Sequence, residues 1–460
     1  MSFKYTWFER NAVDNHMATN ANAQMMPITH KSVITMAVPI MLSNVSQPLL
    51  GVVDTAVIGQ LPQAHYIGAV AIGALIFSLV YWGFGFLRMG TSGIAAQAYG
   101  AGDGKELAAV LYRALLLAAG IGVILLVLAP LISRLSFWLV AASPEIEREA
   151  RIYFGIRIWS APFSLTNYAI MGWLIGIGQM RWAFAVQIYL NVANMALDAL
   201  FVLYLGMATA GIGYGTLIAE VSSAFVGFAV VWMFVRRDGE PPSRARVLDR
   251  ARIKRMVLVN SDIMVRTFCL TFGFAWFAAQ GAKISDVAVS ANAILMQLFF
   301  MGSNMIDGFA TVSEALVGQS VGARSRQRYM TAVRISSQWA MVSGALLSLG
   351  VLLAGPWAID LMSANPDIRS YARSFLWWAA LTPILGAACF QLDGIFIGAT
   401  RTRDMRNMMI ISLIVYLAAG YGLTPVFGNH GLWFAMCLFF IVRGVTLFVR
   451  MPALARDVFA

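Results

Sequence analysis

Long apolar stretches, separated by short polar segments, recur along nearly the whole chain. Most of them exceed 20 residues, which is enough for a helix to cross about 30 Å of hydrocarbon. The pattern predicts an all-α polytopic membrane protein with twelve transmembrane helices. We expect these helices at residues 33–59, 66–99, 107–130, 149–178, 183–205, 214–235, 257–279, 288–321, 329–353, 368–398, 407–427 and 432–449.

The two halves of the chain resemble each other. When position 69 is aligned with position 291, "AVAIGALIF" (69–77) matches "ANAILMQLF" (291–299), and in the same register "AQAYGAG" (96–102) matches "GQSVGAR" (318–324). Because six helices return the chain to its starting side, the repeat is parallel, with its axis along the membrane normal. We therefore predict a tail (1–32), an N-terminal six-helix lobe (33–235), a basic linker (236–256), a C-terminal six-helix lobe (257–450) and a second tail (451–460).

Two glycines recur in this repeat. Gly100 and Gly322 each stand at the end of a predicted helix. We interpret both as C-terminal caps, because glycine is the preferred residue at that position.

Charge is sparse and unevenly distributed. Of the 460 residues, 59% are hydrophobic and 12% are charged, and the net charge is +11. Arginines concentrate in the loops after even-numbered helices, whereas loops after odd-numbered helices are nearly bare of basic residues, as in "QLPQAH", "GMATAGIG" and "GNHG". The positive-inside rule therefore places both termini in the cytoplasm, and we expect a bacterial inner membrane. This bias explains the net charge without a nucleic-acid partner.

The first predicted helix carries polar side chains along one face. Asn44, Gln47 and Asp54 lie at helical spacing on the same side. Pro48 removes a backbone hydrogen bond and is expected to bend the helix beside this face. A charge near mid-bilayer costs roughly 3 kcal/mol on insertion scales, so Asp54 predicts a functional site.

The fifth predicted helix has a similar stripe, spaced by four, three and four residues: Gln187, Asn191, Asn194 and Asp198. Because lipid offers no partners for such groups, we expect both stripes to line one substrate cavity, together with Thr216. Two carboxyl groups in one cavity titrate as a coupled unit. We therefore predict proton coupling at Asp54, Asp198 and Asn194. The alternative is that either aspartate only fixes helix packing.

The C-terminal half does not repeat this pair. In the register of the repeat, the positions that match Asp54 and Asp198 are Trp276 and Gly420. Asp393, deep in the tenth predicted helix, is the best candidate for a cavity acid in this half, and a packing role is the alternative.

Further charges lie inside the second and eighth predicted helices. Arg88 and Asp307 occupy nearly equivalent repeat positions, and Glu314 follows two turns later. We interpret these three residues as a gate that closes one side through an ion pair. Pairing within a helix or with a neighbouring helix is the alternative.

Four other ionisable residues are less informative. Asp262 and Arg266 are four residues apart at the start of the seventh predicted helix, so we expect them to pair with each other. Glu220 and Arg443 also lie within spans, and no pattern assigns them a role.

The sequence contains little that suggests catalysis. Histidines and cysteines do not have metal-ligand spacing, and no phosphate-binding G-x-x-x-x-G-K-[ST] motif occurs. We therefore expect no metal, no cofactor, no catalytic residues and no ATP-driven transport on this chain. A membrane-embedded enzyme is the alternative of a different class, and it would need a His, Cys or Ser cluster at one depth.

Four stretches resemble the multidrug and toxic compound extrusion (MATE) family, closest to its DinF-like branch: "PLLGVVDTAVIG" (48–59), "YWGFGFLRMGTSGIAAQAYG" (81–100), "NVANMALDALFV" (191–202) and "LDGIFIGATRTRDMRN" (392–407). The resemblance covers nearly all of the chain after residue 30. It implies two pseudo-symmetric six-helix lobes arranged as a V. It also implies export of small organic, often cationic and amphipathic, drugs by alternating access and antiport. We expect a monomer.

The resemblance also assigns roles to residues. It makes Asp54 the coupling carboxylate and gives it Asn194 and Asp198 as partners, with Gln47 and Thr216 in the same network. A tyrosine found one turn before the first-helix acid in some relatives is Leu50 here.

The resemblance leaves two coupling ions open. NorM-like members place a glutamate on the seventh helix and a cation site in the C-terminal lobe. The seventh helix here lacks that glutamate, although Asp393 matches the tenth-helix acid. This difference favours H⁺, with Na⁺ as the alternative. A lipid-linked substrate flippase of the same superfamily is a further alternative, but it is expected to have a more cationic cavity.

Overall fold

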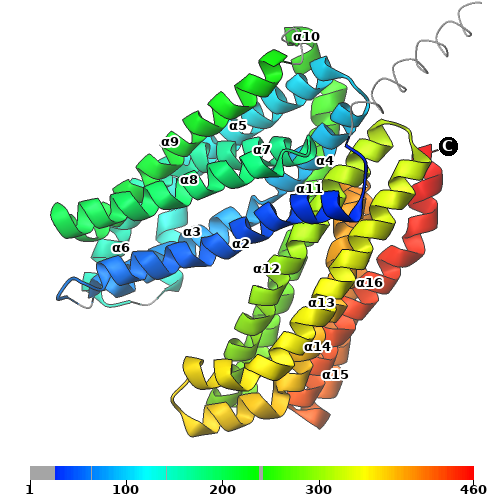
Figure 1. Ribbon diagram of the computed structural model, residues 1–460. Coiled ribbons are helices and arrows are strands. Elements are labelled where there is room, and N and C mark those ends of the chain that lie inside the picture. Colours follow the sequence, from blue (N-terminus) through cyan, green and yellow to red (C-terminus); the bar gives the residue numbers. More distant parts are fainter. Residues whose placement is uncertain (1–25, 64, 141, 238–241, 460) are drawn as a thin grey trace, which may run out of the picture. The chain divides into compact units, whose positions relative to one another are not determined.

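The chain is helical throughout the part that the structure describes (Figure 1). The computed structural model describes residues 26–63, 65–140, 142–237 and 242–459, apart from the side chains of 47–49 and 237. The helices are α2 (His30–Ile58), α3 (His65–Gly83), α4 (Phe86–Gly100), α5 (Gly104–Leu139), α6 (Pro144–Arg157), α7 (Ala161–Gly176), α8 (Met180–Ala199), α9 (Ala208–Arg237), α10 (Arg244–Val247), α11 (Arg250–Ile284), α12 (Asp286–Gly322), α13 (Arg326–Met362), α14 (Pro366–Gly398), α15 (Thr402–Phe427) and α16 (Asn429–Phe459).

Eleven helical segments within the described residues are long and apolar enough to cross a membrane. The predicted fourth helix is not among them, because it is broken into α6, a 3₁₀ turn (Ile158–Ser160) and α7. Pro162, near the start of α7, favours a new helix start because it has no N–H group to donate. The prediction of an all-α polytopic membrane fold is confirmed.

The helix ends differ from the predicted ones in two informative places. The predicted second helix divides into α3 and α4 at Phe84 and Gly85. α16 continues as a helix to Phe459 and so includes most of the predicted C-terminal tail. Of the predicted N-terminal tail, residues 1–25 lie outside the described residues.

The internal repeat has a structural counterpart in helix packing. A Cβ on Gly172 would overlap the carbonyl oxygen of Arg88, where α7 crosses α4. A Cβ on Gly394, the repeat equivalent of Gly172, would overlap the carbonyl oxygen of Ala310, where α14 crosses α12. Small residues allow such close approach of helix backbones in membranes. Each half therefore uses a glycine at the same repeat position to bring two helices together.

Gly100 and Gly322 are the last residues of α4 and α12, as predicted, but capping does not explain them. Neither has a positive φ angle. A Cβ on Gly100 would overlap the carbonyl oxygen of Gln319, and a Cβ on Gly322 would overlap that of Gln97. The two glycines are needed for a reciprocal close approach of the ends of α4 and α12.

The chain forms two compact units. One, the N-terminal unit, comprises residues 42–95 and 103–256, and the other, the C-terminal unit, comprises 26–41, 96–102 and 257–459 among the described residues. The boundary after Met256 coincides with the end of the predicted linker. The sequence did not indicate that 30–41 and 96–102 would belong with the second half.

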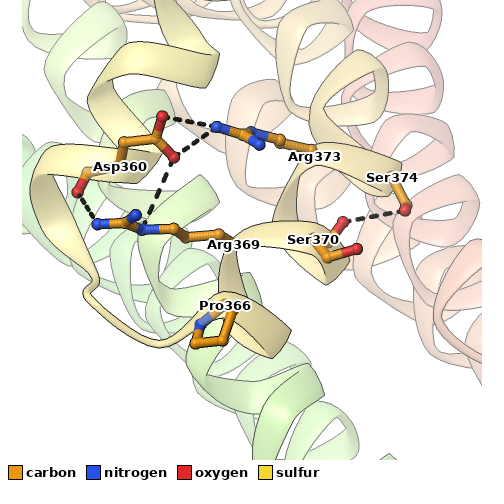
Figure 2. A pocket seen from close by; sticks show the side chains of 6 residues that line it. All are labelled: Asp360, Pro366, Arg369, Ser370, Arg373 and Ser374. Carbon is orange, nitrogen blue, oxygen red and sulfur yellow. Dashed lines mark hydrogen bonds and ion pairs between the residues drawn. The ribbon is translucent and has the colours of Figure 1, made fainter.

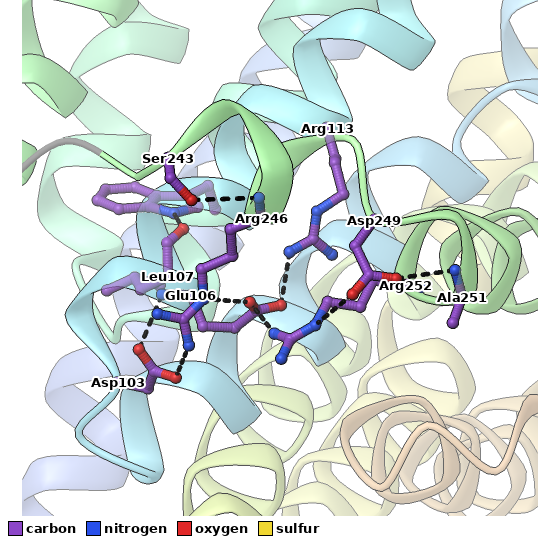
Figure 3. A network of polar contacts seen from close by, with 10 residues as sticks. Asp103, Glu106, Leu107, Arg113, Ser243, Arg246, Asp249, Ala251 and Arg252 are labelled. Atoms are coloured by element: carbon purple, nitrogen blue, oxygen red, sulfur yellow. Dashed lines mark hydrogen bonds and ion pairs between the residues drawn. The ribbon is translucent and has the colours of Figure 1, made fainter.

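The basic linker is fixed to the start of α5 in the N-terminal unit (Figure 3). Glu106 accepts hydrogen bonds from Arg113, from Arg246 of α10 at 3.3 Å, and from Arg252 at the start of α11. Arg246 also donates to Asp103, the N-cap residue of α5. Three arginines therefore share one carboxylate, and two of them come from the linker.

Candidate functional site

The polar stripe predicted on the fifth transmembrane helix is a buried face of α8. The exposed fractions of Gln187, Asn191, Asn194 and Asp198 are 6%, 2%, 1% and 0%. Polar groups buried to this degree need partners inside the protein, because lipid supplies none. The regular spacing in the sequence therefore places all four side chains on one buried face of α8 within the N-terminal unit.

Three helices supply those partners. The amide of Gln187 donates to the oxygen of Asn191 at 3.0 Å, and the amide of Asn191 donates to Ser46 Oγ of α2 at 2.7 Å. The amide of Asn194 donates to Thr216 Oγ1 of α9 at 3.2 Å. The structure thus brings α2, α8 and α9 together through the predicted residues, and it adds Ser46.

Asp54 of α2 and Asp198 of α8 lie beside each other. Their carboxyl groups approach within hydrogen-bonding reach. Neither oxygen of Asp198 accepts a hydrogen bond from any other described group. Two carboxyl groups bond to each other only when one of them carries a proton. A hydrogen bond between these two carboxyl groups therefore requires that one of them is protonated.

The backbone around Asp198 is specialised. A Cβ on Gly215 of α9 would overlap Asp198 Oδ1, so only glycine leaves room for the carboxyl group in this position. Immediately after Asp198, the chain forms a π-helical turn, Leu200–Tyr204. Such turns are frequent at functional sites because they re-aim side chains within a helix. No pattern in the sequence had indicated either feature.

Arg157, the last residue of α6, was not predicted. Its guanidinium group interacts electrostatically with Asp54, Asp198 and Glu220. It also donates to Tyr153 Oη and lies over the ring of Phe77, 4.7 Å from its centroid. The break between α6 and α7 places this half-buried cation beside three carboxyl groups.

Glu220 of α9 extends the cluster. It is 9% exposed and accepts a hydrogen bond from Ser164 Oγ of α7. The amide of Asn167 donates to the backbone oxygen of Glu220 at 3.1 Å. Glu220 was visible in the sequence as an intramembrane acid, but its partners come from another helix at no regular spacing.

The remaining first-helix predictions are only partly described. Asn44 is half-buried on α2. The side chains of Gln47 and Pro48 lie outside the described residues, so their predicted roles stay predictions. The α-helix continues through both positions.

The three predicted gate residues lie in different units. Arg88 belongs to the N-terminal unit, and its carbonyl oxygen contacts Gly172. Asp307 and Glu314 belong to α12 of the C-terminal unit, where Asp307 is half-buried and Glu314 is 3% exposed. The gate stays a prediction.

Asp393, the predicted cavity acid of the C-terminal half, is buried and paired with two arginines, and its role in a cavity stays a prediction. It is 3% exposed and accepts hydrogen bonds from Arg266 of α11 and Arg443 of α16. The expected pairing of Asp262 with Arg266 is wrong, because Asp262 bonds instead to Arg406 at 2.6 Å. Asp262 and Arg266 therefore each bind a residue of another helix rather than each other.

The C-terminal unit replaces the aspartate pair by aromatic packing. Gly420 and Trp276, at the repeat positions of Asp198 and Asp54, lie against each other, and a Cβ on Gly420 would overlap the Trp276 ring. Tyr416, the repeat equivalent of Asn194, packs edge-on against Trp276 with ring centroids 5.0 Å apart. Residues at equivalent repeat positions therefore lie side by side in both units, as two carboxyl groups in the N-terminal unit and as an indole ring against a glycine in the C-terminal unit.

A separate surface pocket of about 570 Å³ lies in the C-terminal unit (Figure 2). It is lined by Asp360 of α13 and by residues of the first turns of α14, including Arg369 and Arg373. Arg373 donates to both oxygens of Asp360 at 2.6 Å. All three charged side chains are exposed to more than a third, so solvent screens their interaction.

Comparison with known proteins agrees with this architecture. A family model described as MatE matches residues 39–200 and 263–421, one segment in each half. The chain is 36% identical over 421 residues to DNA damage-inducible protein F of Escherichia coli (strain K12), covering 91% of each protein. It is 22% identical over 453 residues to multidrug resistance protein MdtK of Edwardsiella ictaluri (strain 93-146), covering 93% of this chain and 96% of that protein.

Solved structures show the same fold. One described as MATE in the bent conformation superposes with a TM-score of 0.84 at 20% identity, covering 94% of this chain and 97% of that one. An outward-facing multidrug resistance MATE family transporter of the MOP superfamily gives a TM-score of 0.82 at 20% identity, covering 93% and 96%. With the matched segments in both halves, these findings show that the chain belongs to the MatE family of multi-pass membrane transporters, which are not enzymes.

Proposed function

We propose that this chain is a proton-driven antiporter that exports small organic, often cationic and amphipathic, compounds. The observation that carries the proposal is the contact between the carboxyl groups of Asp54 and Asp198 inside the N-terminal unit. Such a pair changes its charge by taking up or releasing a proton, and its members act as one titrating unit. Ionisable residues inside membrane spans commonly mark proton pathways.

The charge balance around the pair supports proton binding. Asp54, Asp198 and Glu220 all interact electrostatically with Arg157. Three ionised carboxylates around this guanidinium group would concentrate surplus negative charge in a largely buried cluster, which is energetically costly. The cluster can offset that surplus by holding protons or by holding a positively charged compound. Binding of either therefore opposes binding of the other.

This mutual exclusion provides the coupling. A proton that enters from outside neutralises the pair and favours release of the bound compound. After the transporter has switched its access, loss of the proton to the cytoplasm restores the negative charge. The coupling free energy between the two ligands is reciprocal, so the proton gradient drives export. Each proton that moves inward contributes about 2.3 kcal/mol per 100 mV of membrane potential.

The C-terminal unit supports H⁺ rather than Na⁺ as the coupling ion. Asp393, the acid that a sodium site there would use, is bound by two arginines. Two guanidinium groups beside this carboxylate repel a metal cation. Na⁺-coupled antiport would require those ion pairs to open.

The first test is transport in proteoliposomes that contain the purified full-length chain. An imposed pH gradient, without Na⁺, should drive ethidium movement by the unmodified protein. Asp54→Asn should abolish this movement, because it removes one titrating carboxyl group while keeping its size. Asp360→Asn, which changes an exposed carboxylate of the C-terminal unit, is the matched control and should transport normally. Movement that depends on a Na⁺ gradient alone would overturn proton coupling.

For the membrane and its orientation, we propose a bacterial inner membrane with both termini in the cytoplasm. The arginine-rich linker and the scarcity of basic residues in the alternate loops support this orientation. We also propose that the chain works as a monomer, since α2, α6, α8 and α9 of one unit supply the whole proton-binding cluster.

A further inference from the structure

A second charged cluster is buried in the C-terminal unit. Asp393 Oδ2 accepts hydrogen bonds from both Arg266 and Arg443, and we call these three residues the buried triad. The side chains of Arg443, Asp393 and Arg266 are only 0%, 4% and 9% exposed. They come from α16, α14 and α11 respectively, so the fold assembles the triad from three separate helices.

The buried triad carries one surplus positive charge. Two guanidinium groups are always protonated in proteins and here share a single carboxylate. The thiol of Cys389 also interacts with the triad; it donates to the Gly386 carbonyl oxygen at 3.2 Å and so acts as a neutral donor. Asp262, one turn before Arg266, is itself bound by Arg406 and Thr402.

Several polar atoms of the buried triad have no hydrogen-bond partner among the described residues. They are Nε of Arg266, Nε and Nη1 of Arg443, and Oδ1 of Asp393. Most buried polar groups in proteins are hydrogen-bonded, so each exception needs an explanation. Three unpartnered donor atoms beside a surplus positive charge call for an acceptor that carries negative charge.

An exposed cluster in the same unit shows that two arginines around one aspartate do not by themselves require a bound anion. Asp360, Arg369 and Arg373 also combine one carboxylate with two arginines, but they are 36% to 48% exposed (Figure 2). Water and salt neutralise the surplus charge of that surface cluster. The buried triad has no such access, and so its surplus charge has to be balanced from within.

We infer that the buried triad is a binding site for a monovalent anion, a carboxylate or a halide, held by the open guanidinium N–H groups of Arg266 and Arg443. One negative charge matches the surplus of one, and guanidinium groups bind carboxylates with good geometry. The anion is either a free ion or the carboxylate end of an exported compound. The inference does not depend on which ion drives transport.

The test uses the full-length protein in detergent and measures its thermal unfolding midpoint by tryptophan fluorescence. Chloride or benzoate replaces isethionate at constant ionic strength, so that only the identity of the anion changes. A ligand that binds only the folded state raises the midpoint progressively with its concentration. We expect such a rise for the unmodified chain.

Removing a positive member or the negative member of the triad should change the effect of the anion on the unfolding midpoint in opposite directions. Arg266→Gln removes a donor and should flatten the response to the anion. Asp393→Asn removes the competing carboxylate and should shift the response to lower anion concentrations. Arg373→Gln, in the exposed cluster, is the matched control and should respond like the unmodified chain. A merely structural triad would lower the midpoint in both triad variants without changing its dependence on the anion, and that result would overturn the inference.

A second measurement covers the case in which Arg266→Gln does not fold. The infrared carboxylate bands of ¹³C-labelled benzoate should shift on binding to the unmodified protein and return when chloride displaces it. No shift, together with no rise of the unfolding midpoint for either anion, would also overturn the inference. A response to benzoate at tenfold lower concentration than to chloride would assign the site to organic carboxylates, and equal responses would assign it to small inorganic ions.

Discussion

At the residue scale, the proposed proton-binding pair of Asp54 and Asp198 depends on a neighbour that has no side chain. Asp198 occupies space that the Cβ of any other residue at position 215 would need. Gly215 has ordinary helical geometry within α9, so its role is to leave room rather than to allow an unusual backbone conformation. The position of the carboxyl group is thus set from the opposite helix.

Gly215→Ala should therefore impair proton-driven transport more than it impairs folding. The added methyl group displaces the Asp198 carboxyl group from Asp54, and overpacking of this kind typically costs about 1–3 kcal/mol. The measurement is ethidium movement under a pH gradient, with the melting temperature of the same preparation. Gly120→Ala on α5, where a Cβ meets open space, is the control. Unchanged transport by Gly215→Ala would show that the carboxyl contact is not needed.

Arg157 provides a second test at this scale, because its charge and its hydrogen bond can be separated. Arg157→Lys keeps a positive charge near Asp54, Asp198 and Glu220. Arg157→Gln keeps a donor for Tyr153 but removes the charge. We expect transport under a pH gradient to survive partly in the lysine variant and to fail in the glutamine variant. The reverse order would assign Arg157 a packing role.

At the element scale, the network in Figure 3 fixes the connection between the two halves to the N-terminal unit. Glu106 is 14% exposed and Arg113 only 2%, so the centre of this network is partly shielded from solvent, although Arg252 is 41% exposed. Partial burial makes such ion pairs stronger than fully exposed ones. These ion pairs hold the linker against α5. The chain then continues into the C-terminal unit as α11.

Glu106→Gln should loosen this docking. Removal of the carboxylate leaves Arg113, Arg246 and Arg252 as mutually repelling charges. We expect faster trypsin cleavage between residues 244 and 255, followed by gel electrophoresis and mass spectrometry. Glu147→Gln, at an exposed ion pair with Arg151, should leave the cleavage rate unchanged. Equal cleavage of both variants would mean that the linker is held by other contacts.

The helices were predictable because apolar length and loop composition dominate a membrane sequence. The stripe from Gln187 to Asp198 was also predictable, since regular spacing places residues on one face. Arg157 was missed because the break after α6 is marked in the sequence only by Pro162, which lies inside one long apolar stretch. The pairing of Asp262 with Arg266 was wrong because regular spacing identifies neighbours along one helix, whereas Arg406 and Asp393 come from other helices.

At the scale of the whole molecule, the orientation in the membrane is open to a direct test. The native cysteines lie within helices, two of them buried and Cys269 half-buried. In intact cells, an impermeant maleimide should label Gln60→Cys, in the loop between α2 and α3. It should label Ser243→Cys, in the arginine-rich linker, only after the cells are opened. The opposite pattern would reverse the orientation that the arginine distribution predicts.

The contact between Trp276 and Gly420 bears on how the two halves diverged after the duplication that the repeat records. An aspartate at position 420 alone would collide with the indole ring, and a smaller residue at position 276 alone would leave a void. A second proton-binding pair in the C-terminal half would thus need at least two substitutions, and each would be harmful on its own. Selection acting on single changes would therefore keep the proposed proton-binding pair in one half only.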